Sequence, residues 1–428
     1  MTTGLFSADR PLPEGVRDLL FADAAAWRSL EAALRSTWNS WGYREIILPT
    51  VEYADTLSTD VGAEIDAEMY RFFDRHGRTL ALRPDMTIPT ARVVGTRLYD
   101  QPLPLRISYV GSVYRYEPPR AGRQHEFTQA GVELIGAPSR TADAETVALA
   151  VEALRAAGLP DFRVTLGHVG FFRGLLAALD LPEKVSRSLR QAVNRKAEAE
   201  LAAMLSQSAG VTRAARDALL ALPRLTGGPE VLSEAVGMCA HPQMERALDD
   251  LRQVETLLEA YGVAGAVSYD LAEVRDLDYY TGITYEGFAP GLGFSIISGG
   301  RYDELIGHFG PPLPAVGWAL TLDRVLVARE LQGVEHPEPT PDVLLSVDGC
   351  PECLGWAAAA RKSGLRVEVD PLSLLPEELW RVAVERHIPR VVRHSAPGWL
   401  LVRDRSGEQR VKVGNMEEVA RWRRTAGR

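Results

Sequence analysis

Residues 105–136 read LRISYVGSVYRYEPPRAGRQHEFTQAGVELIG, and this stretch decides the fold. Two runs rich in β-branched and aromatic residues flank a Pro-Pro and an Ala-Gly, which predicts an antiparallel hairpin with a long loop. Side chains alternate across a strand, so Gln129 and Glu133 share one face of the second arm, on either side of Gly131. A glycine there indicates close approach of a ligand, and we predict an open floor for a small molecule. The alternative is a solvated face with a bulge at Gly131.

The polar residues of this hairpin resemble a known signature. The stretch is similar to the second motif of histidyl-tRNA synthetases in three parts: Tyr114-Arg115-Tyr116-Glu117, a loop ending in Gly122-Arg123, and Glu126-Phe127-x-Gln129-x-Gly131-x-Glu133. It is equally similar to non-synthetase relatives, the regulatory subunits of the short-form ATP phosphoribosyltransferase. The rest of the chain has to distinguish the two.

Length and charge narrow the class of protein. A chain of 428 residues is too long for a single hydrophobic core of typical size and implies two or three domains. Its net charge of −9 counts mildly against a nucleic-acid partner, although a local basic patch could still bind tRNA. Without a long apolar run or a signal peptide's basic and apolar regions, we expect a cytoplasmic protein with no membrane segment.

Cysteine and histidine usage predicts neither a disulfide framework nor a metal. Three cysteines are present, and only Cys350 and Cys353 lie close together in the sequence. The eight histidines show no pair at a metal-ligand spacing. We expect no cofactor; a redox role for the Cys350–Cys353 pair is a minor alternative.

Two segments before the hairpin extend the resemblance. A helical pattern over 23–41, Gly42 and a predicted strand over 43–49 match the first class II synthetase motif, which implies a homodimer. A second hairpin over 69–82 leads into Asp85 and Thr87 and a predicted helix over 88–98. Both side chains suit a helix start, which is the structural alternative. In the synthetases a glutamate at this position holds the substrate's amino group, and the shorter Asp85 resembles the regulatory relatives.

A second polar cluster lies at residues 275–282, RDLDYYTG. Arginine grips a carboxylate bidentately, and tyrosine offers a ring and a hydroxyl. With the shared Tyr-Tyr-Thr-Gly context, the resemblance implies that Arg275, Tyr279 and Tyr280 bind a ligand; packing in the core is the alternative.

Residues 317–324, GWALTLDR, resemble the third class II motif, where adenine lies against the backbone. Arg324 is kept, but Thr321 replaces a glycine and Asp323 replaces a glutamate. The Thr321 side chain should occupy space that a bound adenine needs, and the shorter Asp323 should hold its carboxylate farther from the nucleotide. We therefore interpret Arg115, Glu117 and Arg324 as a vestigial nucleotide site.

The order of segments predicts an α+β fold: a class II synthetase-like core, an antiparallel sheet flanked by helices, over 1–330. Residues 169–265 read as a helical insertion and 331–341 as a linker. Residues 342–428 form a small α/β domain resembling a reduced anticodon-binding domain, with alternating strands and helices at 343–347, 354–363, 365–369, 376–385, 390–392 and 399–402.

The resemblance implies a regulatory, non-catalytic subunit that activates the short catalytic subunit and conveys feedback inhibition by histidine. The expected histidine contacts are Asp85, Thr87, Gln129, Glu133, Arg275, Tyr279 and Tyr280. The main alternative is an active histidyl-tRNA synthetase; a histidine-sensing module with another partner is a third. We expect a homodimer within a hetero-oligomer.

Overall fold

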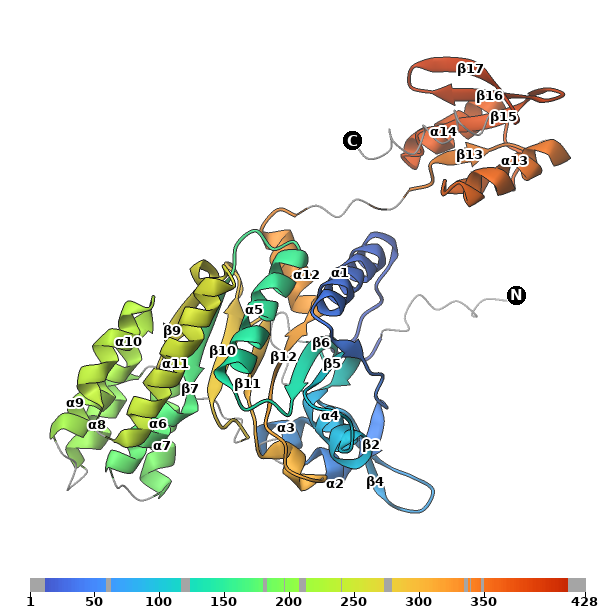
Figure 1. The fold of residues 1–428 in the computed structure, drawn as a ribbon. Helices are drawn as coiled ribbons and strands as arrows, with labels where there is room; N and C mark the ends of the chain where they lie inside the picture. Colours follow the sequence, from blue (N-terminus) through green and yellow to red (C-terminus); the bar gives the residue numbers. More distant parts are fainter. Residues whose placement is uncertain are drawn as a thin grey trace, which may run out of the picture. The chain divides into compact units, whose positions relative to one another are not determined.

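In the computed structural model, a mixed sheet of nine strands forms the centre of the larger of two units (Figure 1). The structure describes residues 12–58, 63–116, 124–179, 183–195, 197–207, 213–239, 241–272, 279–334, 338, 340–347 and 350–414. The chain divides into two units, Met1–His336 and Pro337–Arg428.

The sheet order in the larger unit is β1-β5-β6-β12-β11-β10-β7-β9-β8. Its strands are β1 (Arg44–Glu45), β5 (Leu105–Tyr114), β6 (Glu126–Ile135), β7 (Arg163–His168), β8 (Thr226–Gly227), β9 (Val267–Asp270), β10 (Ile283–Phe288), β11 (Ile297–Arg301) and β12 (Ala315–Thr321). The pairs β1–β5 and β7–β9 are parallel, and the other neighbours are antiparallel. The predicted hairpin is confirmed as β5 and β6, with Leu105 opposite Ile135.

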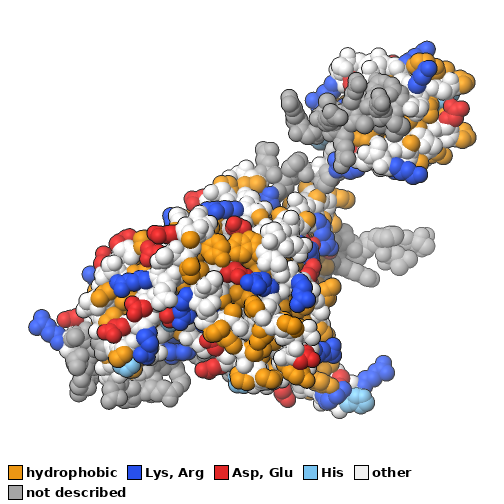
Figure 2. All heavy atoms as spheres, viewed as in Figure 1, with side chains coloured by type: hydrophobic (Ala, Val, Ile, Leu, Met, Phe, Trp, Pro, Cys, Tyr) orange, Lys and Arg blue, Asp and Glu red, His pale blue; other side chains and the backbone are white. Residues whose placement is uncertain are grey.

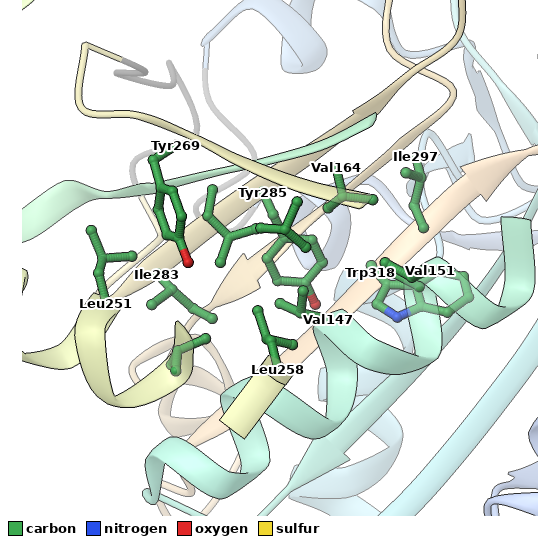
Figure 3. Packing of buried hydrophobic residues seen from close by; sticks show 14 of the residues in the cluster. Val147, Val151, Val164, Leu251, Leu258, Tyr269, Ile283, Tyr285, Ile297 and Trp318 are labelled. Atoms are coloured by element: carbon green, nitrogen blue, oxygen red, sulfur yellow. The ribbon is translucent and has the colours of Figure 1, made fainter. Parts of the chain in front are cut away.

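Long helices cover one face of this sheet: α1 (Phe21–Ser40), α5 (Arg140–Ala156) and α11 (Pro242–Ala260). Figure 3 shows the result, with Val147 and Val151 of α5 packed near Tyr285 and Trp318 of the sheet. The apolar spacing predicted for α1 is confirmed, since Trp38 is buried and its ring meets Trp318 edge-on at 6.1 Å. Removal of this surface from water stabilises the layered arrangement.

The opposite face carries shorter elements. They are α2 (Ala54–Leu57), α3 (Ala63–Glu68), α4 (Thr87–Val93), a π-helical turn (Val94–Leu98), the 3₁₀ turn Leu305–His308, and a three-stranded sheet of β2 (Val51–Tyr53), β3 (Arg71–Phe73) and β4 (Thr79–Leu82). A second group of buried hydrophobic residues lies here, including Ile88, Tyr279 and Tyr302.

The helical segment predicted over 169–265 extends the main core. Its other helices are α6 (Val169–Leu179), α7 (Glu183–Asn194), α8 (Glu198–Gln207), α9 (Arg213–Ala221) and α10 (Glu230–Glu234), with 3₁₀ turns at Leu222–Arg224, Ala235–Met238 and Ala264–Ala266. Phe171, Leu201 and Leu219 belong to the same buried cluster as the sheet residues. After β12, α12 (Leu322–Leu331) packs on α1 and β6.

The smaller unit is an α/β domain with the strand order β14-β13-β15-β16-β17. Its elements are β13 (Val343–Leu345), α13 (Pro351–Lys362), β14 (Val367–Val369), α14 (Pro376–Glu385), β15 (Val391–Ala396), β16 (Trp399–Asp404) and β17 (Gly407–Lys412). Our sequence analysis missed β17, because its residues are mostly polar and exposed and only Val411 is buried. Such a strand has no clear hydrophobic alternation.

Two predicted elements differ in detail. The strand expected over 43–49 pairs with β5 at Arg44–Glu45, and the Ile46 N–H still donates to Ser108. It ends there because the carbonyls of Leu48 and Pro49 accept hydrogen bonds from Arg83 instead. The helix expected over 88–98 changes to the π-helical turn at Val94. Among the described residues, no helix has an apolar stretch long enough to cross a bilayer.

Candidate functional site

A cavity opens on the face of the sheet opposite α5, where β6, β12 and β11 lie beside the start of α4. Its lining includes the predicted contacts Asp85, Thr87, Gln129, Glu133, Tyr279 and Tyr280, together with Arg115 and Arg324. Two predicted residues, Arg275 and Glu117, lie outside the described residues. The cavity volume is about 120 Å³. This is below the ~300–1,000 Å³ of pockets for drug-sized ligands, so this conformation suits a small ligand.

Glu133 is the most buried carboxylate of the cavity, with 1% of its surface exposed. Tyr109 and Thr87 donate hydrogen bonds to its Oε1 at 3.0 and 3.2 Å, and Tyr302 donates to Oε2. Burial disfavours the charged form and raises the pKa of Glu133 to about 7, although these hydroxyls pull it down. The carboxylate is therefore poised between its two protonation states near neutral pH.

Gly317 and Gly131 shape the space around Glu133. The sequence analysis singled out only Gly131 as part of the site. Gly317 pairs with Glu133 across β12 and β6, and a Cβ at Gly317 would lie 1.7 Å from Oε2. The prediction of an open floor at Gly131 is wrong, because Tyr109 stands opposite Gly131 in the hairpin and fills that space. A Cβ at Gly131 would lie 2.7 Å from the Tyr109 hydroxyl oxygen. The floor is thus an aromatic ring that also donates to Glu133.

Asp85 has the structural role considered for it and also lines the cavity. Its Oδ1 accepts the N–H of Ile88 at 3.1 Å, so it satisfies a free donor at the start of α4. The carboxylate is nevertheless buried in the cavity wall, and desolvation raises its pKa while the positive charge of Arg115 lowers it. Arg115 is held nearby, since its Nε donates to the Pro84 carbonyl at 2.8 Å and its guanidinium lies 5.5 Å from the Phe127 ring centre.

Gln129 is oriented by the backbone. Its Oε1 accepts the N–H of Met86 at 3.0 Å. The carboxamide oxygen therefore points to the start of α4, which leaves the NH₂ group as the end of this cavity-lining side chain that could donate to a ligand. A group that accepts hydrogen bonds, such as a neutral imidazole nitrogen or a carboxylate, suits this donor.

Three tyrosines form the aromatic wall. The rings of Tyr279 and Tyr280 lie 4.7 Å apart at 53°, and those of Tyr279 and Tyr302 lie 5.9 Å apart at 76°. Burial raises the pKa of Tyr279 and Tyr302 well above the usual value, so both hydroxyls stay neutral donors. A Cβ at Gly300 would lie 2.8 Å from the Tyr280 ring, which shows why a glycine is needed beneath it.

The third-motif residues lie at the other end of the cavity. Thr321 and Arg324 line it, and the Arg324 guanidinium lies 4.9 Å from the Phe294 ring centre and donates to the Ser295 carbonyl. Asp323 instead accepts the Thr128 N–H at 3.2 Å and pairs with Arg17 at 3.1 Å. Its carboxylate lines a separate pocket on the side of α1.

The cavity thus carries two buried carboxylates and several neutral hydroxyl donors. Buried carboxylates attract a cationic group, because an unpaired charge in a low-dielectric site is costly. Sequence reasoning missed Tyr109, Tyr302 and Gly317. Tyr109 could have been found from the sequence, since hairpin arms of equal length place it opposite Gly131. No neighbouring residue in the sequence links Tyr302 to this site.

Comparison with known proteins identifies the family to which the chain belongs. The sequence model of the histidyl-tRNA synthetase family matches residues 15–325. An ATP phosphoribosyltransferase regulatory subunit of Symbiobacterium thermophilum is 43% identical over 395 residues, 90% of this chain and 97% of that protein. The chain belongs to the family of ATP phosphoribosyltransferase regulatory subunits. A regulatory subunit of Halothermothrix orenii is 35% identical over 95% of this chain and 96% of its own length.

Solved structures confirm that this regulatory-subunit family shares the class II synthetase-like fold. A Bacillus halodurans protein described as an ATP phosphoribosyltransferase regulatory subunit/histidyl-tRNA synthetase superimposes with a TM-score of 0.80 at 31% identity, covering 91% of this chain and 99% of that one. A histidyl-tRNA synthetase from Nostoc gives a TM-score of 0.81 at 23% identity, covering 96% and 99%. The predicted α+β core with a small C-terminal sheet domain is therefore confirmed.

Proposed function

We propose that this chain is a non-catalytic regulatory subunit that activates a short-form ATP phosphoribosyltransferase catalytic subunit and conveys feedback inhibition by histidine. The names of its relatives support a regulatory role in that complex. The observation that carries the histidine proposal is the pair of buried carboxylates, Asp85 and Glu133, in one small cavity. An amino acid that carries an ammonium group and a basic ring is matched in charge to such a site.

The contacts proposed for histidine follow from the donors and acceptors described above. Asp85 and Glu133 accept from its cationic groups, the NH₂ of Gln129 donates to an acceptor on the ligand, and Tyr279 and Tyr280 pack against the ring. Thr87 completes the wall through its bond to Glu133. Arg275, outside the described residues, is proposed to bind the carboxylate.

Feedback requires histidine to bind one state of the complex better than another, because a ligand without differential affinity shifts no equilibrium. Histidine should therefore bind more tightly to the inhibited complex than to the active one. The reciprocal effect is that binding of the catalytic subunit changes histidine affinity by the same factor.

An active histidyl-tRNA synthetase is the second candidate, favoured by the arginines Arg115 and Arg324 in the cavity wall. Two observations weigh against it. Thr321 adds a β-branched side chain to the nucleotide end, and Asp323 is directed away to Arg17 and Thr128. We therefore interpret that end as a vestigial nucleotide site.

One experiment separates the two. The pure chain is incubated with histidine, ATP and labelled pyrophosphate, and in parallel with a short catalytic subunit and its substrates. We expect activation of the phosphoribosyltransferase, inhibition of that activity by histidine, and no histidine-dependent pyrophosphate exchange. Brisk exchange would identify a synthetase; histidine binding with neither activity would indicate a sensor with another partner.

We also propose that two copies associate through the class II core. The strand end after β1 and the three-stranded sheet expose large apolar side chains, with Ile47 90% and Phe73 74% exposed, along with Val51, Tyr53 and Phe72. Figure 2 shows hydrophobic side chains gathered on the part of this unit that carries β2, β4 and α4. Large apolar side chains exposed together on one part of a surface are typical of protein interfaces.

A further inference from the structure

Three side chains of different metal-binding chemistry meet in the smaller unit. One ligand atom from each of Cys350, Glu352 and His394 lies within 4.8 Å of the other two. Within the part of the chain that the structure describes, no other group of three such residues comes together. All three residues belong to the smaller unit, whereas the cavity described above is lined by residues of the larger unit.

The fold brings the three residues together from two elements. Cys350 is the residue before α13, and Glu352 lies in the first turn of that helix. His394 is on β15, where the pairing with β16 shifts register between His394 and Ala396. Such irregularities redirect side chains locally, so His394 meets the residues at the start of α13.

A hydrogen bond holds the carboxylate in place. Glu352 Oε2 accepts the N–H of Gly398 at 3.2 Å, which ties the first turn of α13 to the turn between β15 and β16. Gly398 has φ +75°, a left-handed conformation that favours glycine. Metal-ligating carboxylates are usually oriented by a second hydrogen bond of this kind, and the bond leaves oxygen lone pairs for a metal.

The two neighbouring cysteines differ in their surroundings. Cys353 is fully buried and belongs to the hydrophobic core of the smaller unit, whereas Cys350 is partly buried and packs against that core. Cys350 is therefore the thiol that can meet His394 and Glu352. The spacing of the two cysteines alone did not reveal this site, because His394 lies on β15 and only the folded sheet brings it beside Cys350.

We propose that Cys350, Glu352 and His394 bind one Zn²⁺ ion per chain, with water in the fourth position. Thiolate, imidazole and carboxylate are the ligands that zinc uses, and three protein ligands with one open position form a recurring zinc geometry. Binding would link the start of α13 to the β15–β16 hairpin. A metal that binds only the folded state stabilises it by mass action.

The test uses the full-length protein, stripped with a chelator under reducing conditions and titrated with Co²⁺. We expect saturation at one ion per chain, tetrahedral cobalt bands, a thiolate-to-cobalt charge-transfer band, and displacement by Zn²⁺. Cys350→Ser should remove the thiolate band, and His394→Ala should weaken binding at least tenfold. Zn²⁺ should raise the melting temperature of wild type but not that of Cys350→Ser.

Two thiol substitutions outside the group serve as controls. Cys353→Ser tests the neighbouring thiol, and Cys239→Ser, in the larger unit, tests a thiol whose replacement leaves the smaller unit intact. Both should keep the stoichiometry and the charge-transfer band. The proposal is overturned if wild type shows no saturable cobalt spectrum, if the band survives in Cys350→Ser, or if His394→Ala binds like wild type.

Discussion

The carboxylate of Glu133 lies directly over Gly317 of the neighbouring strand, where a Cβ would come within 1.7 Å of Oε2. Any side chain at position 317 must therefore push Glu133 away from the hydroxyls of Tyr109 and Tyr302. The position of the cavity's central acid is determined by the absence of a side chain on β12.

Gly317→Ala should reduce histidine affinity by about 10- to 100-fold, because hydrogen bonds to a charged group contribute ~1.5–3 kcal/mol. It should also lower the melting temperature, since the new Cβ would lie 2.3 Å from the Val132 carbonyl oxygen. Calorimetric titration with histidine measures the first effect. Gly237→Ala is the matched control, because a Cβ at Gly237 meets no atom within 4 Å. Equal affinities for the two variants would contradict the proposed site.

Glu133→Gln should change how stability depends on pH. Burial raises the pKa of Glu133 from 4.5 to about 7 in the folded protein, so between these values the folded state holds more protons than the unfolded one. The free energy of unfolding of wild type should therefore fall by about 3 kcal/mol as the pH rises from 4.5 to 7. The carboxamide introduced at position 133 cannot titrate, so the variant should lack this component.

Urea unfolding at several pH values between 4.5 and 8 tests this expectation through the difference between variant and wild type. That difference should grow in favour of Glu133→Gln as the pH rises. Glu304→Gln, at an exposed position, controls for the chemical change. Parallel stability curves for Glu133→Gln and wild type would mean that the carboxylate is not desolvated as described.

Much of this site was predictable because its residues sit in ordered motifs. Asp85, Thr87, Gln129 and Glu133 come from two local segments, and their convergence follows from the hairpin pattern and the helix start after Pro84. Tyr302 was not predictable, because it reaches Glu133 only after β11 and β12 have been placed beside β6.

The difference between local patterns and contacts made only in the folded chain also explains the errors in the predicted fold. Strands with buried alternation, such as β5 and β6, were located from sequence, whereas β17 carries one buried residue and was missed. The strand after Gly42 was overestimated because its carbonyls are taken by Arg83, a side chain from a different part of the chain. Competition from distant donors is not visible in local propensity.

Arg301→Met should destabilise the larger unit by roughly 3–5 kcal/mol, the usual effect of breaking a buried ion pair. Arg301 and Asp143 are both buried, and the Arg301 guanidinium donates to Asp143 at 2.8 Å and to the Ala137 carbonyl at 3.2 Å. Its loss leaves Asp143 with Arg140 as its remaining cationic neighbour. Chemical denaturation measures the change. Arg71→Met, which breaks the half-exposed pair with Asp66, should cost less than about 1 kcal/mol, and comparable losses for both variants would refute the argument.

Ile47→Asp should convert the proposed dimer into a monomer. At a two-fold interface each substitution acts twice, so the loss of ~2 kcal/mol of apolar burial per side chain weakens association by roughly 1,000-fold. Sedimentation velocity over a range of concentrations measures the shift, and Phe73→Asp should reproduce it from a different strand. Val236→Asp changes an exposed apolar residue in the helical segment and should leave the dimer intact. A wild-type protein that stays monomeric at high concentration, or an Ile47→Asp variant that still dimerises, would place the interface elsewhere.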